Sequence, residues 1–313
     1  MTKPVYLSEA EVQDLAPSAS TLADALAEAF RGRAAGKVAM PAKTSFSLDG
    51  SDASFHAMSA AVLGLAAGVK WVAGSPANAA RDLPHLNALL LLSDADSGLV
   101  RAIVEARYLT GWRTAALSLL AARYLARPDA TRLGLIGCGL QAASHCEALC
   151  EEFPIRSAKL YSRRRETAQS FAVSLGERGL DTHVSDEPAE VLAESDIVVT
   201  TVPAHPGLVG FLDAARLAPG AFVTMVDLGR SWQAESTGAF DRCFTDDCAQ
   251  SCALAGSNPT FAAMTFHGDL AALASGEVPG RQSEDQRIAF LFPGVALADI
   301  VAGHLLLRRW ERA

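Results

Sequence analysis

The sequence predicts an α/β protein of two domains, in which a doubly wound parallel sheet follows an N-terminal α+β domain. Three observations lead to this prediction. Apolar strands alternate with helices from about residue 130 onward, strand-like segments dominate the residues before 113, and a glycine-rich turn joins one apolar strand to a helix. Strand, crossover helix and strand in succession are typical of a parallel sheet, because parallel neighbours need a crossover connection.

The N-terminal third reads as a mostly antiparallel sheet with one helix. Residues 24–36 have helical periodicity, and strands expected at 42–48 and 54–60 flank the turn sequence DGSD. Further strands are expected at 67–74, 87–94 and 99–109. A long helix over 113–127 is expected to end at Pro128, because proline cannot continue a helix.

The second domain is expected to alternate strands and helices. Its strands are predicted at 132–137, 157–162, 195–202 and 221–228. Its helices are predicted at 140–153 and 165–179. An amphipathic helix over 294–312 is expected to pack back on the first domain. The predicted domains are therefore 1–125 together with 294–313, and 126–293.

Composition limits the classes of partner. The chain has 313 residues, half of them hydrophobic and a fifth charged, which is enough to build a sizeable core. A net charge of −8 argues against nucleic acid, because neutralising phosphates needs a basic face. The first residues do not resemble a signal peptide and no apolar run reaches membrane-spanning length, so a cytoplasmic location without a membrane partner is expected.

The six cysteines are expected to be thiols, because they form no C-x-x-C pair and no export signal precedes them. A zinc site is the alternative for one group of residues: Cys243, Cys248, Cys252 and His267. Their irregular spacing favours small buried side chains instead, so no metal is expected.

The turn Gly137-x-Gly139-x-x-Ala142 predicts a dinucleotide-binding Rossmann fold. It follows an apolar strand directly and opens a helix. In this context the first glycine permits a tight turn, the second lets the backbone approach a pyrophosphate, and the small third residue lets helix and strand pack closely. The intervening Leu140 and Gln141 are expected at the cofactor as well.

The second strand of this fold indicates which dinucleotide binds. NAD enzymes usually place an acidic residue about 20 positions after the glycines, on the ribose 2′-hydroxyl. Here the segment reads Ser162, Arg163, Arg164 and Arg165. Hydroxyl and guanidinium groups can bind a 2′-phosphate that a carboxylate would repel, so NADP(H) is favoured over NAD(H). The alternative is a solvated basic start of a helix.

Lys70 places an ammonium group inside the otherwise apolar segment GVKWVAG. A buried ammonium is costly unless it is paired, so its position suggests a function. The chain has only five lysines against 22 arginines, which argues against Lys70 being an ordinary surface residue that only improves solubility. The alternative is a lysine on an edge strand whose head group reaches water.

Several segments together resemble the ornithine cyclodeaminase/mu-crystallin family. They are GVKWVAGSPANAARDLP, LLLLSDADSG, RTAALSLLAARYLAR, LGLIGCGLQA, SDIVVTTV and GDLAALASGEVPGR. The resemblance covers nearly the whole chain. It implies a homodimer with an N-terminal substrate and dimerisation domain, a Rossmann domain, an active site between them, and hydride transfer at the α-carbon of an amino or imino acid.

The resemblance also assigns residues. Lys70 matches the active-site lysine, and Arg113 matches the arginine that binds the substrate carboxylate, with a surface salt bridge as its alternative. The remaining substrate positions are Lys43, where relatives often have arginine, Met58, and His85, which replaces a threonine and either donates a proton or fills space. The end of SDIVVTTV adds cofactor positions at Thr200, Thr201 and Val202.

One departure from the family concerns the catalytic aspartate. Alignment on Glu235 puts Gly229 where cyclodeaminases have that aspartate, and Asp227 lies two residues earlier as a substitute base. The expected reaction is therefore NADPH-dependent reduction of a ketimine or cyclic imino acid of the Δ1-pyrroline-2-carboxylate type. Two alternatives stay open: an ornithine cyclodeaminase that uses NAD catalytically, and a non-catalytic NADPH-loaded ligand-binding protein.

Overall fold

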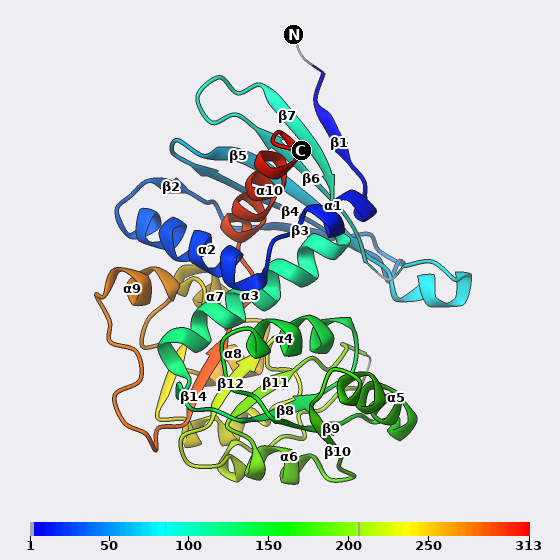
Figure 1. Ribbon diagram of the computed structural model, residues 1–313, viewed down its shortest axis with the longest axis vertical. Helices are drawn as coiled ribbons and strands as arrows, with labels where there is room; N and C mark the ends of the chain where they lie inside the picture. The colour runs from blue at the N-terminus through cyan, green and yellow to red at the C-terminus, as the bar shows by residue number, and fades with distance from the viewer. Residues whose placement is uncertain (1–2, 85, 206) are drawn as a thin grey trace. The chain divides into compact units, whose positions relative to one another are not determined.

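The computed structural model describes residues 3–84, 86–205 and 207–313 (Figure 1). The chain divides into two compact units, each with its own sheet. The N-terminal unit comprises the residues up to Arg113 and those from Gly294 onward, and the Rossmann unit comprises Thr114–Pro293. Among the helices of the described residues, none is long and apolar enough to cross a membrane.

The N-terminal unit is a seven-stranded sheet with helices. Its strands are β1 (Val5–Leu7), β2 (Val38–Ala39), β3 (Thr44–Ser47), β4 (Ser54–Val62), β5 (Ala66–Gly74), β6 (Leu86–Ser93) and β7 (Val100–Glu105). Its helices are α1 (Glu9–Leu15), α2 (Ala19–Ala34), the 3₁₀ segment η1 (Pro76–Arg81) and α10 (Ala296–Trp310). The strand order is β1-β7-β6-β5-β4-β2, with β3 paired to β4, so β5 is an interior strand.

Three features of this unit differ from the expectations. The segment 99–109 was expected to be one strand, but β7 ends at Glu105 and a helix begins at Arg107. This helix, α3 (Arg107–Leu125), crosses the division between the units and starts six residues before the expected position. The short strand β1 was not expected, and it pairs with β7 in parallel rather than antiparallel.

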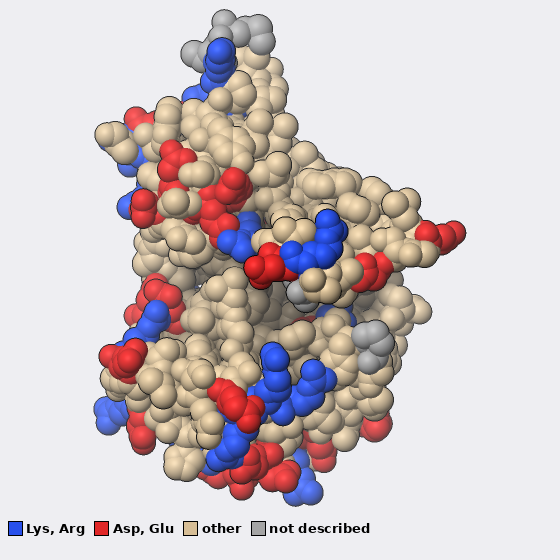
Figure 2. Space-filling view, turned by 90° about the vertical axis from the view of Figure 1, so that its right-hand side faces the viewer, with Lys and Arg blue, Asp and Glu red and all other residues tan. Residues whose placement is uncertain are grey.

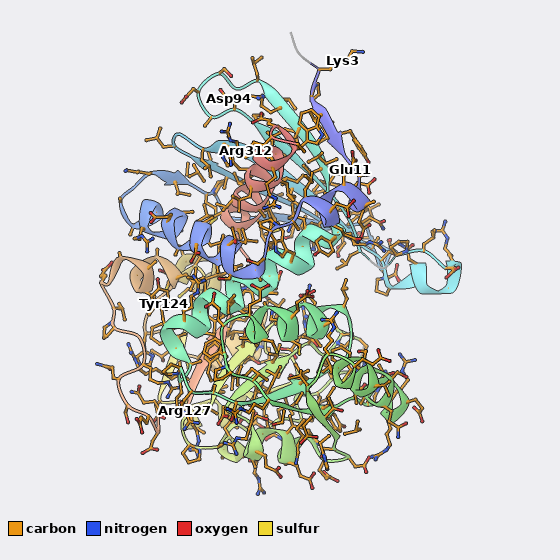
Figure 3. The ribbon with its side chains drawn as sticks, in the orientation of Figure 1. Lys3, Glu11, Asp94, Tyr124, Arg127 and Arg312 are labelled. Atoms are coloured by element: carbon orange, nitrogen blue, oxygen red, sulfur yellow. The ribbon has the colours of Figure 1, made fainter. Side chains whose placement is uncertain are left out.

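The C-terminal helix α10 belongs to the N-terminal unit and packs on β4, β5 and β6. Figure 3 labels Arg312, which lies just beyond the end of this helix. The helix lies close to the strands at Gly303, where an added Cβ atom would stand 2.4 Å from Leu90 and 2.7 Å from Leu92. The last helix of the chain therefore covers one face of the first sheet.

The Rossmann unit has a second seven-stranded sheet, entirely parallel. Its strands are β8 (Arg132–Ile136), β9 (Ser157–Tyr161), β10 (Asp181–Val184), β11 (Ile197–Thr200), β12 (Phe222–Met225), β13 (Arg242–Phe244) and β14 (Ile288–Leu291), in the order β10-β9-β8-β11-β12-β14-β13. Its helical segments are α4 (Leu140–Cys150), α5 (Arg165–Gly176), α6 (Pro188–Glu194), η2 (Ala214–Arg216), η3 (Ala234–Ala239), α7 (Cys248–Leu254), α8 (Pro259–Ala263) and α9 (Leu270–Ser275).

This order confirms the predicted doubly wound sheet. The chain starts at β8, moves outward through β9 and β10, and returns to β11 on the other side of β8. Loops beyond the carboxyl ends of β8 and β11 therefore lie side by side, which is where such sheets bind ligands. Strands β10, β13 and β14 were not anticipated, because their short segments lack a clear period.

Candidate active site

The turn after β8 has the geometry that the glycine pattern predicts. Gly137 has φ +92°, and a Cβ atom there would lie 2.7 Å from Thr201 Oγ1, so a larger residue would strain the turn and displace its neighbour. Thr201 Oγ1 donates a hydrogen bond to the Gly137 carbonyl at 3.2 Å. Gly139 caps α4 and faces open space, while Ala142, in the first turn of α4, is fully buried. The open space beside Gly139 fits a pyrophosphate at the start of α4.

A cavity of about 600 Å³ adjoins this turn. It is lined by Ile136, Gly137, Cys138, Gly139, Tyr161, Ser162, Arg163, Arg164, Thr167, Thr201, Val202, Pro203, His205, Gly207, Leu208, Val209 and Phe211. Seven of the predicted cofactor residues are in this set. Leu140, Gln141, Ala142 and Thr200 are outside it. The aromatic wall formed by Tyr161 and Phe211, whose ring centres are 6.1 Å apart, was not predicted.

The three arginines after β9 differ in their surroundings. Arg163 and Arg164 line the cavity, and Arg163 Nη1 lies 3.2 Å from His205 Nε2. Arg165 instead pairs with Asp186. The basic segment is thus neither wholly directed at the cavity nor wholly a solvated helix start. Figure 2 looks onto the side of the Rossmann unit that carries α5, and basic side chains gather there.

Asp227, the predicted substitute base, lies in the Rossmann unit, and both oxygens of its carboxylate accept hydrogen bonds. It accepts hydrogen bonds from Thr200 Oγ1 at 3.0 Å, Ser231 Oγ at 2.6 Å, and the Gly229 and Val202 amides at 3.1 and 3.4 Å. Burial raises the pKa of this carboxyl group, and the hydrogen bonds oppose the increase. Four hydrogen-bond donors to this buried carboxylate favour a structural role for Asp227, in which it stabilises the turn after β12.

Gly229, predicted to stand where cyclodeaminases have aspartate, has a backbone conformation that suits glycine. Its φ is +68°, and a Cβ atom there would lie 2.6 Å from Thr260 Cγ2. The preceding Leu228 also has positive φ, at 59°. An aspartate at position 229 would therefore be strained and would collide with Thr260.

A buried hydrogen-bond chain fixes α4 to its neighbours. His145 is fully buried, and burial lowers its pKa to about 4, so the ring is neutral near pH 7. Because the Gln141 carbonyl can only accept, Nδ1 donates to it at 2.7 Å and Nε2 accepts from Ser118 Oγ at 2.9 Å. Ser118 Oγ then accepts from Thr224 Oγ1 at 2.8 Å. The chain links α3, α4 and β12, and so positions the helix whose N-terminus faces the cavity.

Lys70 lies in the N-terminal unit on the face of β5 that α10 covers. The residues paired with it on the adjacent strands are Met58 on β4 and Leu90 on β6. The side chain is 1% exposed on an interior strand, which rules out the edge-strand alternative. Trp71, the next residue, is 42% exposed on the opposite face, as the alternation along a strand requires.

Lys70 forms a hydrogen-bonded ion pair with Asp299, a residue that was not predicted for the site. Lys70 Nζ donates a hydrogen bond to Asp299 Oδ1 at 2.7 Å, and Arg113 Nε lies 2.9 Å from the same oxygen. The N–H of Nε does not point at that oxygen, so the second contact is an ion pair without hydrogen-bond geometry. An acidic residue in the apolar stretch ALADIVAG is the signal that could have revealed it, as the isolated ammonium revealed Lys70.

The other predicted substrate residues are placed as follows. Arg113 is 6% exposed, so its ion pair is buried rather than the surface salt bridge of the alternative reading. The half-buried Lys43 lies near enough for its charge to lower the pKa of both Lys70 and His56. Met58 is buried opposite Lys70. His85 lies outside the described residues.

Comparisons with known proteins show the family to which the chain belongs. A model of the ornithine cyclodeaminase/mu-crystallin family matches residues 2–313. The chain belongs to the ornithine cyclodeaminase/mu-crystallin family. An alanine dehydrogenase of Archaeoglobus fulgidus is 30% identical over 310 residues, which cover 96% of this chain and 94% of the relative.

Two further members of the family are informative. A Δ1-pyrroline-2-carboxylate reductase of Bacillus cereus is 30% identical over 263 residues, covering 78% of this chain and 77% of that protein. The solved structure of an archaeal alanine dehydrogenase dimer with bound NAD has a TM-score of 0.85 and 27% identity, covering 99% of this chain and 96% of that chain. The two-domain α/β fold of this chain is therefore the fold of the family.

Proposed function

We propose that this protein is an NAD(P)H-dependent reductase of a ketimine or cyclic imino acid, of the Δ1-pyrroline-2-carboxylate type. The observation that carries the proposal is the buried cluster of Lys70, Arg113 and Asp299, in a chain that also has a dinucleotide-binding turn. Relatives named alanine dehydrogenase and Δ1-pyrroline-2-carboxylate reductase support it, because both names describe hydride transfer at the carbon beside a carboxylate.

Each residue of the cluster has a chemical role in this proposal. Arg113 binds the substrate carboxylate, since its planar guanidinium offers parallel N–H donors, and Lys43 adds positive charge near it. Lys70 donates a proton to the imine nitrogen, which makes the adjacent carbon a better hydride acceptor. Burial, and then the charge of Arg113, lower the pKa of Lys70 from 10.5 to about 8. Lys70 is therefore protonated at neutral pH and a stronger acid than an exposed lysine.

The nicotinamide supplies the hydride when it is bound. Gly137, Gly139 and the start of α4 hold the pyrophosphate in this proposal, and Arg163 and Arg164 with Ser162 hold the 2′-phosphate of NADP(H). Preference for NADP(H) is supported by the two arginines on the cavity wall and by the absence of an acidic residue among those lining it.

A substrate screen tests the proposed reaction. Purified protein is given NADPH and either Δ1-pyrroline-2-carboxylate or an acyclic ketimine formed from a 2-oxo acid and an amine, and cofactor oxidation is followed at 340 nm. We expect consumption of at least one imine and formation of the matching amino acid. Tight NADPH binding without turnover of any imine would instead indicate a ligand-binding protein.

We further propose that the protein is a homodimer formed through the outer face of the N-terminal sheet. Phe46, Phe55 and Trp71 lie there with neighbouring ring centres 5.6 to 5.8 Å apart. Tyr6 and Leu89 on the same face are 53% and 44% exposed. An aromatic face of this kind is typical of protein interfaces, and the related alanine dehydrogenase is described as a dimer.

A further inference from the structure

Among the described residues whose ion pairs or charges act on Lys70, positive groups outnumber carboxylates. Lys70 on β5 and Arg113 on α3 are almost completely buried, and Lys43 and the half-buried His56 on β4 are close enough to act on Lys70 or to be acted on by it. The carboxylate in contact with the two buried cations is Asp299 on α10, which is 0% exposed.

Stability alone does not explain a carboxylate at this position. Replacing a buried ion pair by well-packed apolar side chains is often neutral or stabilising. Asp299 is also imperfectly satisfied, because Oδ1 serves both cations while Oδ2 has no hydrogen-bond partner among the described residues. An arrangement in which Oδ1 contacts both cations and Oδ2 contacts no described donor suggests selection for the charge at Oδ1 rather than for packing.

We propose that Asp299 is a positioning residue that keeps the Lys70 ammonium protonated beside Arg113, so that Lys70 can serve as the proton donor. The inference deepens the proposed function and rests on it for the identity of the reaction. Two opposing influences meet at Lys70 Nζ. Burial and the Arg113 charge favour the neutral amine, and the Asp299 charge and its 2.7 Å hydrogen bond favour the ammonium.

Without the Asp299 carboxylate, the influences that remain on Lys70, chiefly burial and the charge of Arg113, would favour loss of its proton. An opposite charge within about 4–6 Å typically moves a pKa by one to three units. Removing it should therefore bring the Lys70 pKa, now about 8, to or below neutrality. At pH 7 much of the protein would then hold a neutral Lys70, which cannot protonate the imine.

The charge state of Lys70 can be measured without turnover. The chain has five lysines, so ¹³C-labelled lysine gives a simple NMR spectrum, and Lys70→Met identifies the Lys70 signal. We expect the midpoint of its pH titration to fall by at least one pH unit in Asp299→Asn. It should rise in Arg113→Met, because that variant removes the neighbouring positive charge. Glu311→Gln is the matched control, since Glu311 caps the C-terminal end of the same helix but pairs with Arg101 and Arg308, and it should leave the midpoint unchanged.

Kinetics provide the second readout. With NADPH and the best imine, the alkaline limb of the kcat profile should move to lower pH in Asp299→Asn by the shift measured by NMR. Asp299→Glu, which retains the charge, should keep the limb near its wild-type position. A Lys70 midpoint in Asp299→Asn within a few tenths of a pH unit of the wild type would overturn the inference, and so would a loss of kcat equal at every pH. If wild-type protein reduces no imine, the proposed function fails, while the NMR titration still decides the role of Asp299.

Discussion

Among single residues, Lys70 shows how a group can serve the proposed reaction while destabilising the fold. Its pKa falls from 10.5 in the unfolded chain to about 8 in the folded one, chiefly through burial. Between those pH values the unfolded chain binds more protons than the folded chain, so raising the pH increases the free energy of unfolding. Below pH 8 the full penalty of the buried charge is present.

Lys70→Met should therefore fold well and lose most turnover. At pH 7 we expect its free energy of unfolding to equal or exceed that of the wild type, by up to about 3 kcal/mol, because an apolar side chain of similar length replaces a buried charge. The difference should shrink as the pH rises from 8 to 10.5. Denaturant titrations at several pH values measure it. A variant several kcal/mol less stable at pH 7, or one with near-normal kcat/KM, would contradict this account.

At the scale of elements, the chain from His145 through Ser118 to Thr224 links a helix to the sheet. The pKa of His145 is lowered to about 4 by burial, so between pH 6.5 and 4 the unfolded chain binds a proton that the folded chain does not. The stability that the neutral ring contributes is therefore complete above pH 6.5 and is lost as the pH falls toward 4.

We expect this chain to make the wild type acid-sensitive. Relative to His145→Gln, the wild type should lose about 3 kcal/mol of unfolding free energy between pH 6.5 and 4. Ser118→Ala should cost about 1–3 kcal/mol at neutral pH, because it leaves a buried ring nitrogen without its donor. Parallel pH dependence in the wild type and His145→Gln would show that His145 does not control acid stability.

The turn between β9 and α5 offers a matched test of cofactor preference. The variants Arg163→Ala and Arg164→Ala should each weaken NADPH binding by about 1–3 kcal/mol and leave NADH nearly unaffected, since a charge-assisted hydrogen bond to the 2′-phosphate is lost. Arg165→Ala is the control, because Arg165 pairs with Asp186. Fluorescence titrations give the two dissociation constants. Equal affinity of the wild type for NADPH and NADH would refute the preference.

The elements also show what a sequence reveals and what it conceals. The glycine turn, β8 and α4 were predicted because an apolar strand, the glycine pattern and the start of a helix coincide within fifteen residues. The start of α3 was misplaced because the apolar and aromatic residues after Glu105 suit a strand as well as a buried helix. The pairing of Asp299 was missed because its partners lie 186 and 229 residues away: the local sequence marks an unusual carboxylate in an apolar stretch but not what it contacts.

For the whole molecule, the aromatic outer face of the N-terminal sheet predicts the assembly. Wild-type protein should elute with about twice the chain mass of 32.8 kDa in light-scattering chromatography. Phe46→Glu should shift it toward the monomer, because a carboxylate would be buried in the interface without a partner. Val173→Glu, on the 64% exposed Val173 of α5, is the control. A wild-type monomer would leave the exposed aromatic residues without this explanation.

For the whole molecule we also expect the reaction to run in the direction of imine reduction, because the turn after β12 argues against ornithine cyclisation. Ornithine cyclisation needs a base for the substrate amine, and general bases typically contribute about 10² to 10⁴-fold. Alignment on Glu235 predicts that Gly229 stands at the position of the family's aspartate, and the carboxylate of Asp227, two residues earlier, already accepts four hydrogen bonds. We therefore expect wild-type protein with L-ornithine and NAD to release little ammonia, while imine reduction proceeds.

Restoring the aspartate should not create a cyclodeaminase. Gly229→Asp would force a side chain into a backbone with φ +68° and against Thr260, so we expect a loss of unfolding free energy of about 1–3 kcal/mol and no ammonia release. Gly229→Ala is the matched variant, since it carries the same strain without the carboxylate. Efficient conversion of ornithine to proline by the wild type would defeat this argument, and loss of that activity in Asp227→Asn would then assign the base to Asp227.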